Sequence, residues 1–463
     1  MHHPVIPKYL QRYAEPEAQA VSLKRAVGMR HVLCVPVYDE SPDDLVLLDD
    51  LPRNGQVLCI LLVNERSDSP APVADRNRAL VRSLVDRYGA GRTAGYGATE
   101  HETPFGGLLL MRRTADTTPL PAKQGVGLAR KIAADTALSL HHRGLLQAAM
   151  MHNTDADASL PCDYFARVSP VPVASRCAPA RERRPVFSAV FPFVHVGEPG
   201  PLHDAGQFYE CSLRYYVVGL QRAGSPYAMH TVGSTVAVSM AAYAIVRGFP
   251  RRHGAEDFYL LNKLAKVGPV RRLGGAPIAL RDRASDRVPF GTGPAVARLL
   301  AGQPRRLYDP RTFACLGAFL DGLARLCRGS TGGSTGGSTG PADRAVLTSA
   351  LCPQLPSVIG ERLVATSGIE GALRSAFQRG PHPGARLAHL HTYFDGFRTL
   401  KWIHTLRDAG LPEVSAGEAV AGLAGVPAGS VEAEVAALQR LEATECRGDV
   451  GVADAIPSSP DHS

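Results

Sequence analysis

Two short apolar runs separated by a helix pattern constrain the fold of this chain more than any other feature. Residues 31–36 (HVLCVP) and 57–63 (VLCILLV) are apolar and rich in β-branched residues, which is typical of strands buried on both faces. Between them, residues 41–44 (SPDD) have the composition of a helix N-terminus, and leucines follow at helical spacing. The order strand, helix, strand predicts parallel strands joined by a right-handed crossover.

The same alternation returns further along the chain. Residues 127–141 predict an amphipathic helix, and residues 146–151 predict the strand that follows it. We therefore expect a doubly wound α/β fold with a mostly parallel sheet, whose ligands bind beyond the carboxyl ends of the strands. After about residue 295 the strand signals fade, and residues 295–326 and 386–407 predict helices. The expected parts are an N-terminal segment (1–28), a main domain (29–292), a helical extension (293–328), a flexible Gly/Ser/Thr linker (329–340), a helical C-terminal region (341–445) and a disordered tail (446–463).

Charge and cysteine usage narrow the class of partner and the compartment. The net charge is +8, and the arginines are dispersed, so nucleic acid is not expected, whereas phosphate-bearing small molecules and a membrane surface remain open. The nine cysteines are scattered without a CxxC pair, which fits a reducing compartment. The sequence contains no apolar run long enough to span a bilayer and no signal-peptide core. We expect a cytoplasmic protein, with peripheral membrane association left open.

One Asp-x-Asp segment, Asp155-Ala156-Asp157, directly follows the strand predicted at 146–151. At the carboxyl end of a strand, two neighbouring carboxylates favour binding of a hard divalent cation such as Mn²⁺ or Mg²⁺, which can also hold diphosphate oxygens. The alternative is a solvated turn in which the aspartates act as caps. The position after a buried strand favours the metal site.

A second acidic pair, Glu256-Asp257, stands at the start of a helix pattern that ends at Gly268. Two acids at this position complement the helix dipole, which stabilises a helix by a few tenths of a kcal/mol up to about 1 kcal/mol. The same position would also suit a general base held in place by the helix. Residue types alone leave these two interpretations equally open.

Two basic segments are candidate phosphate sites. Residues 123–127 (KQGVG) form a glycine turn before a helix that carries Arg130, so Lys123, Gly127 and Arg130 could surround a phosphate. Arg283 and Arg287 precede a glycine-rich turn and could hold a phosphate bidentately. The alternative to phosphate binding is that these residues are ordinary surface charges, in the first segment on a helix face and in the second on a loop.

Taken in order, these segments resemble the GT-A glycosyltransferases of the family-2 type over residues 31 to about 292. The similar motifs are VPVYDE (35–40), VNERS (63–67), GVGLARKIA (125–133), NTDAD (153–157), LPCDYF (160–165), GST (233–235), Gly248-Phe249 and Glu256-Asp257. Two positions depart from the family pattern, because Asp39 replaces the usual asparagine and Asn64 replaces the usual aspartate. These departures leave UDP and GDP both open.

The resemblance implies a GT-A fold and a metal-dependent, hexosyltransferase-like enzyme that uses a nucleotide sugar. Asp155 would face the ribose and the metal, and Asp157 would bind the metal. Asp257, with Glu256 as second candidate, would accept the proton of the acceptor hydroxyl in an inverting transfer, while a retaining transfer stays open. The acceptor would be lipid-linked or a small molecule. The implied nucleotide-sugar contacts are Pro36, Tyr38, Glu40, Asn64, Lys123, Gly127, Arg130, Asp155, Arg283 and Arg287.

Two alternatives remain. A nucleotidyltransferase that makes sugar nucleotides usually has a glycine-rich basic loop after the first strand, whereas residues 38–41 (YDES) are acidic and lack glycine. A non-catalytic GT-A-like binding module would not need Asp155, Asp157 and Asp257, which are present here.

Overall fold

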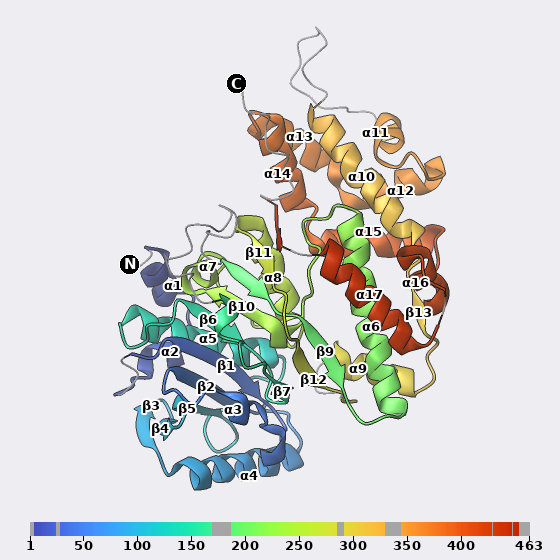
Figure 1. Cartoon of the computed structure of the whole chain (residues 1–463). Coiled ribbons are helices and arrows are strands. Elements are labelled where there is room, and N and C mark those ends of the chain that lie inside the picture. Colours follow the sequence, from blue (N-terminus) through green and yellow to red (C-terminus); the bar gives the residue numbers. More distant parts are fainter. Residues whose placement is uncertain are drawn as a thin grey trace, which may run out of the picture. The chain divides into compact units, whose positions relative to one another are not determined.

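The computed structural model divides into two compact units, which Figure 1 shows with the element labels used below. It describes residues 4–24, 28–168, 187–284, 291–328, 344–427, 429–446 and 448–452. The first unit comprises Met1–Gly206, Thr231–Leu264 and Arg271–Leu300, and the second comprises Gln207–His230, Ala265–Val270 and Ala301–Ser463. These units do not follow the boundary expected at residue 292, because residues 207–230 group with the C-terminal region and residues 293–300 with the N-terminal one.

A large sheet forms the centre of the first unit. Within this unit its strand order is β11-β8-β10-β6-β1-β2-β5-β4-β3, and the four adjacent strands β6, β1, β2 and β5 run parallel to one another. A smaller sheet has the order β7-β12-β9. The strands are β1 (His31–Val37), β2 (Val57–Asn64), β3 (Arg92–Gly95), β4 (Ala98–Thr103), β5 (Gly106–Arg113), β6 (Met150–Asn153), β7 (Ala158–Ser159), β8 (Ser188–Val190), β9 (Phe193–Val196), β10 (Val236–Ser239), β11 (Val270–Arg272) and β12 (Ile278–Arg281).

Helices precede, connect and follow these strands. They are α1 (Val5–Arg12), α2 (Pro16–Ala20), η1 (Pro42–Asp44), α3 (Leu47–Asp50), α4 (Ala71–Tyr88), α5 (Val126–His142), η2 (Ala166–Val168), α6 (Pro201–Arg222), η3 (Gly233–Thr235), α7 (Met240–Ile245), α8 (Glu256–Val267) and α9 (Thr292–Leu300). Helices α6 and α8 each contain residues assigned to both units.

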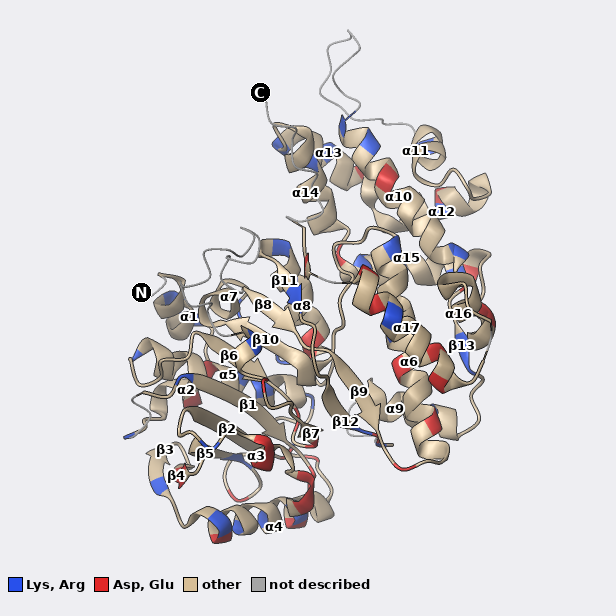
Figure 2. Ribbon diagram, viewed as in Figure 1, with Lys and Arg blue, Asp and Glu red and all other residues tan. Residues whose placement is uncertain are grey.

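The core of the first unit follows from the two apolar runs. Every residue of β2 is buried, and all of β1 after His31 is buried. The two strands are parallel, with Val35 opposite Leu61. Figure 2 shows β1 and β2 without charged residues, whereas α4 carries several of both signs. The expected pair of parallel strands is confirmed. Both strands are almost entirely apolar because strands that are covered on both faces have no polar side to expose.

Three local predictions differ from the structure. The helix expected after residue 41 forms only η1 and α3, because Leu45, with a ψ of 43°, leaves helical geometry between them. The Ser41 N–H and hydroxyl donate to the Asp44 carboxylate at the start of η1. The strand expected at 146–151 begins only at Met150 and ends at Asn153. Helix α5, expected to be amphipathic, is buried on all sides from Gly127 to Leu140.

The second unit is mainly helical. The helix expected at 386–407 is two helices, because the Asp395 carboxylate accepts a hydrogen bond from the Arg398 N–H and caps a new helix. The elements are β13 (Arg306–Leu307), α10 (Arg311–Arg328), α11 (Arg344–Leu351), α12 (Ser357–Ser367), α13 (Ile369–Arg379), α14 (Pro383–Tyr393), α15 (Gly396–Ala409), β14 (Val414–Ser415), α16 (Ala416–Ala424), α17 (Val431–Glu445) and β15 (Gly448–Val450).

The predicted α/β class with a helical C-terminal region is confirmed. The predicted linker at 329–340 lies outside the described residues, as do residues 453–463 of the predicted tail, whereas residues 448–450 of that tail form β15. Within the described part of the chain, no helix is long and apolar enough to cross a bilayer.

Candidate functional site

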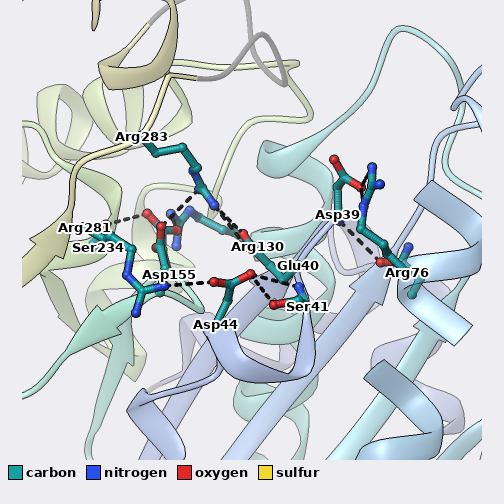
Figure 3. A network of polar contacts seen from close by, with 12 residues as sticks. Asp39, Glu40, Ser41, Asp44, Arg76, Arg130, Asp155, Ser234, Arg281 and Arg283 are labelled. Carbon is teal, nitrogen blue, oxygen red and sulfur yellow. Dashed lines mark hydrogen bonds and ion pairs between the residues drawn. The ribbon is translucent and has the colours of Figure 1, made fainter. Parts of the chain in front are cut away.

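The candidate site lies beyond the carboxyl ends of the central strands β1 and β6. These strands are parallel, with Cys34 opposite Asn153, so the segments that follow them emerge at the same edge of the sheet. Glu40 follows β1, and Asp155 and Asp157 follow β6. Figure 3 shows Glu40 and Asp155 from close by, together with the arginines that surround them.

Arg130 joins two of the predicted motifs. Its Nε donates to Glu256 Oε1 at 2.9 Å, and its Nη1 donates to the carbonyl oxygen of Thr154 at 3.3 Å. Its Nη2 forms an ion pair with Asp155. The Arg130 side chain is only 3 % exposed, so its charge depends on these partners, and removing them would leave a buried cation uncompensated. One guanidinium therefore connects the Asp-x-Asp segment with the start of α8.

A buried network fixes the helix that carries Arg130. The Asp135 carboxylate, one turn further along α5, accepts hydrogen bonds from Tyr9 Oη at 2.6 Å, Tyr243 Oη at 2.9 Å and Lys131 Nζ at 2.8 Å. It also accepts the Glu15 N–H at 2.8 Å. The N-terminal helices α1 and α2 are thus bonded to α5, a contact that sequence reasoning did not foresee.

Asp155 is held as a carboxylate. Its side chain keeps 37 % exposure, and it accepts hydrogen bonds from Arg130 and from the Ser234 hydroxyl. Partial burial acts to raise the pKa of Asp155, but the Arg130 charge and the Ser234 hydrogen bond outweigh it and hold this pKa below its usual value. The sequence gives the segment 233–235 no role beyond its likeness to the family, because the contact of Ser234 with Asp155 depends on tertiary position.

Arg283 connects the other two acidic residues of the site. Its Nη1 donates to both carboxylate oxygens of Glu40, at 2.9 and 3.0 Å, and its Nη2 lies 3.2 Å from Asp157 Oδ2. Two residues earlier, Arg281 Nη1 donates to Asp44 Oδ1 at 2.9 Å. Strand β12 therefore brings two arginines to the acidic residues that follow β1 and β6. The pair of Arg281 with Asp44 was not foreseen, because no local pattern connects residues so far apart in sequence.

Asp257 differs from Asp155 in the direction in which its surroundings shift its pKa. It follows Ala255, whose φ of 59° turns the chain into α8, and its Oδ1 accepts the Phe258 N–H at 2.7 Å. Burial, and next the neighbouring Glu256 carboxylate, raise the pKa of Asp257 to about 7. A carboxyl group with this pKa can both accept and release a proton near neutrality, as a general base requires. Glu256 is 4 % exposed and bonded to Arg130, so it helps to position that arginine.

Buried amides line the same edge of the sheet. Asn64, the last residue of β2, is 2 % exposed, and its Oδ1 has no hydrogen-bond partner among the described residues. Asn153, the last residue of β6, is fully buried, and neither its Oδ1 nor its Nδ2 has a partner there. Unpaired buried polar atoms are costly, and a polar ligand could satisfy them. Asn153 was not among the predicted site residues.

The remaining predicted contacts lie outside this network. The Gly127 N–H donates to the Arg252 carbonyl at 3.2 Å, and a Cβ at Gly127 would lie 2.6 Å from backbone oxygens, so this glycine serves close packing and does not present its N–H to a phosphate. Tyr38 Oη is 3.1 Å from Ser69 Oγ, and Pro36 is buried within β1. Lys123 is exposed, and Arg287 lies outside the described residues.

The donor set limits the kind of metal ion that the site can hold. No group of three or more His, Cys, Asp or Glu side chains arranged for a metal occurs among the described residues. Asp155 already accepts from Arg130 and Ser234, and Asp157 is paired with Arg283. One or two carboxylates fit a divalent cation whose other ligands are phosphate oxygens and water. They do not fit a cation bound by the protein alone.

Comparison with solved structures finds similarity to TarS from S. aureus. TarS 1–349 in complex with UDP-GlcNAc is 13 % identical, with 82 % of this chain and 92 % of that chain covered and a TM-score of 0.35. The complex of the same fragment with UDP is 12 % identical, with the same coverage and a TM-score of 0.34. No family model and no curated protein matches the chain.

Proposed function

We propose that this protein is a glycosyltransferase that moves a sugar from a nucleotide-diphosphate sugar to an acceptor hydroxyl. The observation that carries the proposal is the bridge made by Arg130. It brings Asp155 of the only Asp-x-Asp segment together with Glu256, next to a carboxyl group whose pKa is about 7. Sugar transfer from a nucleotide diphosphate requires a general base for the acceptor hydroxyl and positive charge near the leaving diphosphate. This site combines a carboxyl group that can act as the base, an arginine, and a pair of aspartates that can hold a cation.

Asp257 supplies the base in this proposal. As the acceptor oxygen forms a bond to the anomeric carbon, its proton passes to the Asp257 carboxylate. The bond between the anomeric carbon and the diphosphate oxygen breaks, and the diphosphate leaves with the electron pair. A single displacement of this kind inverts the configuration at the anomeric carbon. The acceptor would be a lipid-linked or small-molecule hydroxyl compound.

Asn64 supports the nucleotide part of the proposal. Its buried Oδ1 has no partner among the described residues, and it lies at the carboxyl end of β2, next to β1 in the sheet. An amide oxygen at this edge can accept a hydrogen bond from an N–H of a nucleobase or from a ribose hydroxyl. Both UDP- and GDP-sugars meet this requirement.

A divalent cation, Mn²⁺ or Mg²⁺, would be held by Asp155 and Asp157 together with the diphosphate. Bound there, such an ion neutralises the negative charge that develops on the leaving diphosphate. Arg130 and Arg283 contribute positive charge at the same place.

A donor screen tests the proposal without knowledge of the acceptor. The protein is incubated with UDP- and GDP-sugars and MnCl₂, and the released UDP or GDP is measured. We expect slow hydrolysis of at least one donor and a higher melting temperature with the matching nucleoside diphosphate. A nucleotidyltransferase would instead release pyrophosphate from a nucleoside triphosphate and a sugar phosphate. A binding module would be stabilised by the nucleotide without hydrolysing any donor. Either result would overturn the proposal.

A further inference from the structure

Asp282 is a buried carboxylate that stands in the chain between Arg281 and Arg283, the two arginines that reach the candidate site from the end of β12. Its side chain is 1 % exposed, and its Oδ2 lies 2.5 Å from His203 Nδ1 in α6. Its Oδ1 has no hydrogen-bond partner among the described residues. A buried carboxylate with one partner contributes little net stability compared with an apolar side chain of the same volume. It does fix an orientation, so we looked for what this orientation serves.

Backbone pairing and close packing hold the chain at Asp282. Its N–H donates to the Val196 carbonyl oxygen at 2.9 Å and so extends the pairing of β12 with β9. Its carboxylate fills the space that side chains at two glycines would need. A Cβ at Gly197 would lie 2.5 Å from Oδ2, and a Cβ at Gly206 would lie even closer to Oδ1. Because Gly206 and His203 both belong to α6, the carboxylate is held between this helix and the end of β9.

The two arginines beside Asp282 contact the candidate site instead of α6. In an extended chain, successive side chains point to opposite sides. Arg281 donates to Asp44, and Arg283 donates to Glu40, as Figure 3 shows. The contacts that hold Asp282 therefore also set the point from which each arginine leaves the chain.

We propose that the pair of His203 and Asp282 positions Arg283 for the diphosphate of the donor. His203 orients the Asp282 carboxylate, and the backbone held in this way presents the Arg283 guanidinium at the acidic residues of the site. His203 is thus a positioning residue, which acts on the donor through Arg283. This inference rests on the proposed function, because the diphosphate is the ligand that Arg283 would meet.

The physical reason is that the loss of His203 changes geometry without removing a charge from the site. The buried Asp282 carboxylate would lose its only side-chain partner among the described residues, and such a group is costly to leave in place. As it shifts toward water, the chain at Arg283 shifts with it. Bidentate hydrogen bonds from a guanidinium to phosphate depend on alignment, so the affinity for the diphosphate falls.

Calorimetry of UDP and GDP with MnCl₂ tests this inference. His203→Leu removes the N–H donor, and we expect the nucleotide that the parent binds to bind about tenfold more weakly. His203 is 23 % exposed, so the change should not prevent folding. His203→Asn places an amide N–H near the position of Nδ1, and it should restore the affinity to within about threefold of the parent. This rescue separates the hydrogen bond from the bulk of the ring.

Two further variants separate positioning from general stability. His230→Leu is the matched control, because His230 Nε2 lies 2.6 Å from Glu442 Oε1 in the second unit. It removes a pair of the same kind and should leave nucleotide affinity within about twofold of the parent. The second variant is Arg283→Gln, which already lacks the guanidinium. In that background, His203→Leu should weaken nucleotide binding by less than about twofold.

The inference is overturned if His203→Leu binds the nucleotide as tightly as the parent, or if His203→Asn gives no rescue. It is also overturned if His230→Leu gives the same loss, or if the loss is as large in the Arg283→Gln background. Any of these results in a parent that binds a nucleotide overturns this inference alone. A parent that binds neither UDP nor GDP overturns the proposed function and this inference together.

Discussion

Arg130 and Arg283 each bridge two carboxylates in the candidate site, yet their surroundings differ. Arg130 is 3 % exposed and comes from α5, a helix buried on all sides, whereas Arg283 is 33 % exposed and follows the short strand β12. A buried ion pair that loses one partner leaves an uncompensated charge, while a partly exposed pair can exchange its partner for water or for a ligand. Burial therefore constrains the first arginine more strongly than the second.

The largest expected effect concerns the Arg130 side of the site, where Asp257 lies. Asp257→Asn keeps the size of the side chain and its capping ability but cannot accept a proton from the acceptor. We expect sugar transfer to fall by about 10²–10⁴-fold, with binding of the nucleoside diphosphate unchanged. A transfer assay measures the rate, and calorimetry measures the affinity for the nucleoside diphosphate. Activity within a few-fold of the parent would remove Asp257 from the mechanism and leave Glu256 as the next candidate.

The second prediction compares the two arginines by what their loss does to the free energy of unfolding. Arg130→Met leaves Asp155 and Glu256 without their shared cation, and we expect it to lower the free energy of unfolding by about 3–5 kcal/mol. Arg283→Gln removes a cation that is 33 % exposed, although its carboxylate partners are enclosed, and should lower the free energy of unfolding by less than Arg130→Met does. Urea denaturation of both variants, measured side by side, gives these values. Equal losses would show that exposure does not separate the two arginines.

The smallest effect is the pH dependence of transfer. Because the pKa of Asp257 is raised to about 7, the carboxylate form of the base gains population as the pH rises through 7. We expect the rate to be about tenfold lower at pH 6 than on the plateau above pH 8. The raised pKa has the opposite effect on stability. The folded state keeps Asp257 protonated above the usual pKa of 3.8. Protonation of Asp257 therefore stabilises the fold at low pH, and this stabilisation is lost as the pH rises through about 7. A rate that does not change between pH 6 and 8 would contradict the assignment of the base.

Local patterns predicted the parts of the fold that burial dictates directly. The apolar runs at 31–36 and 57–63 became the parallel strands β1 and β2, and the acidic pair at 256–257 begins α8 as expected. Patterns failed where the packing of single residues decides the outcome. The helix predicted after residue 41 is interrupted at Leu45, and Lys131 and Asp135 pair inside α5, so polar residues that suggested an exposed face are buried.

The sequence by itself determined the α/β class, the two central apolar strands and the acidic and basic residues that follow the strands. Periodicity and residue type are local properties, and they suffice for these features. Only the tertiary structure decided that Arg130 joins Asp155 to Glu256, that Ser234 donates to Asp155, and that Arg283 lies between Glu40 and Asp157. Each of these contacts joins segments that are far apart in sequence. The packing of the strands and of α5 brings such segments together, and burial then fixes the charge that each group carries.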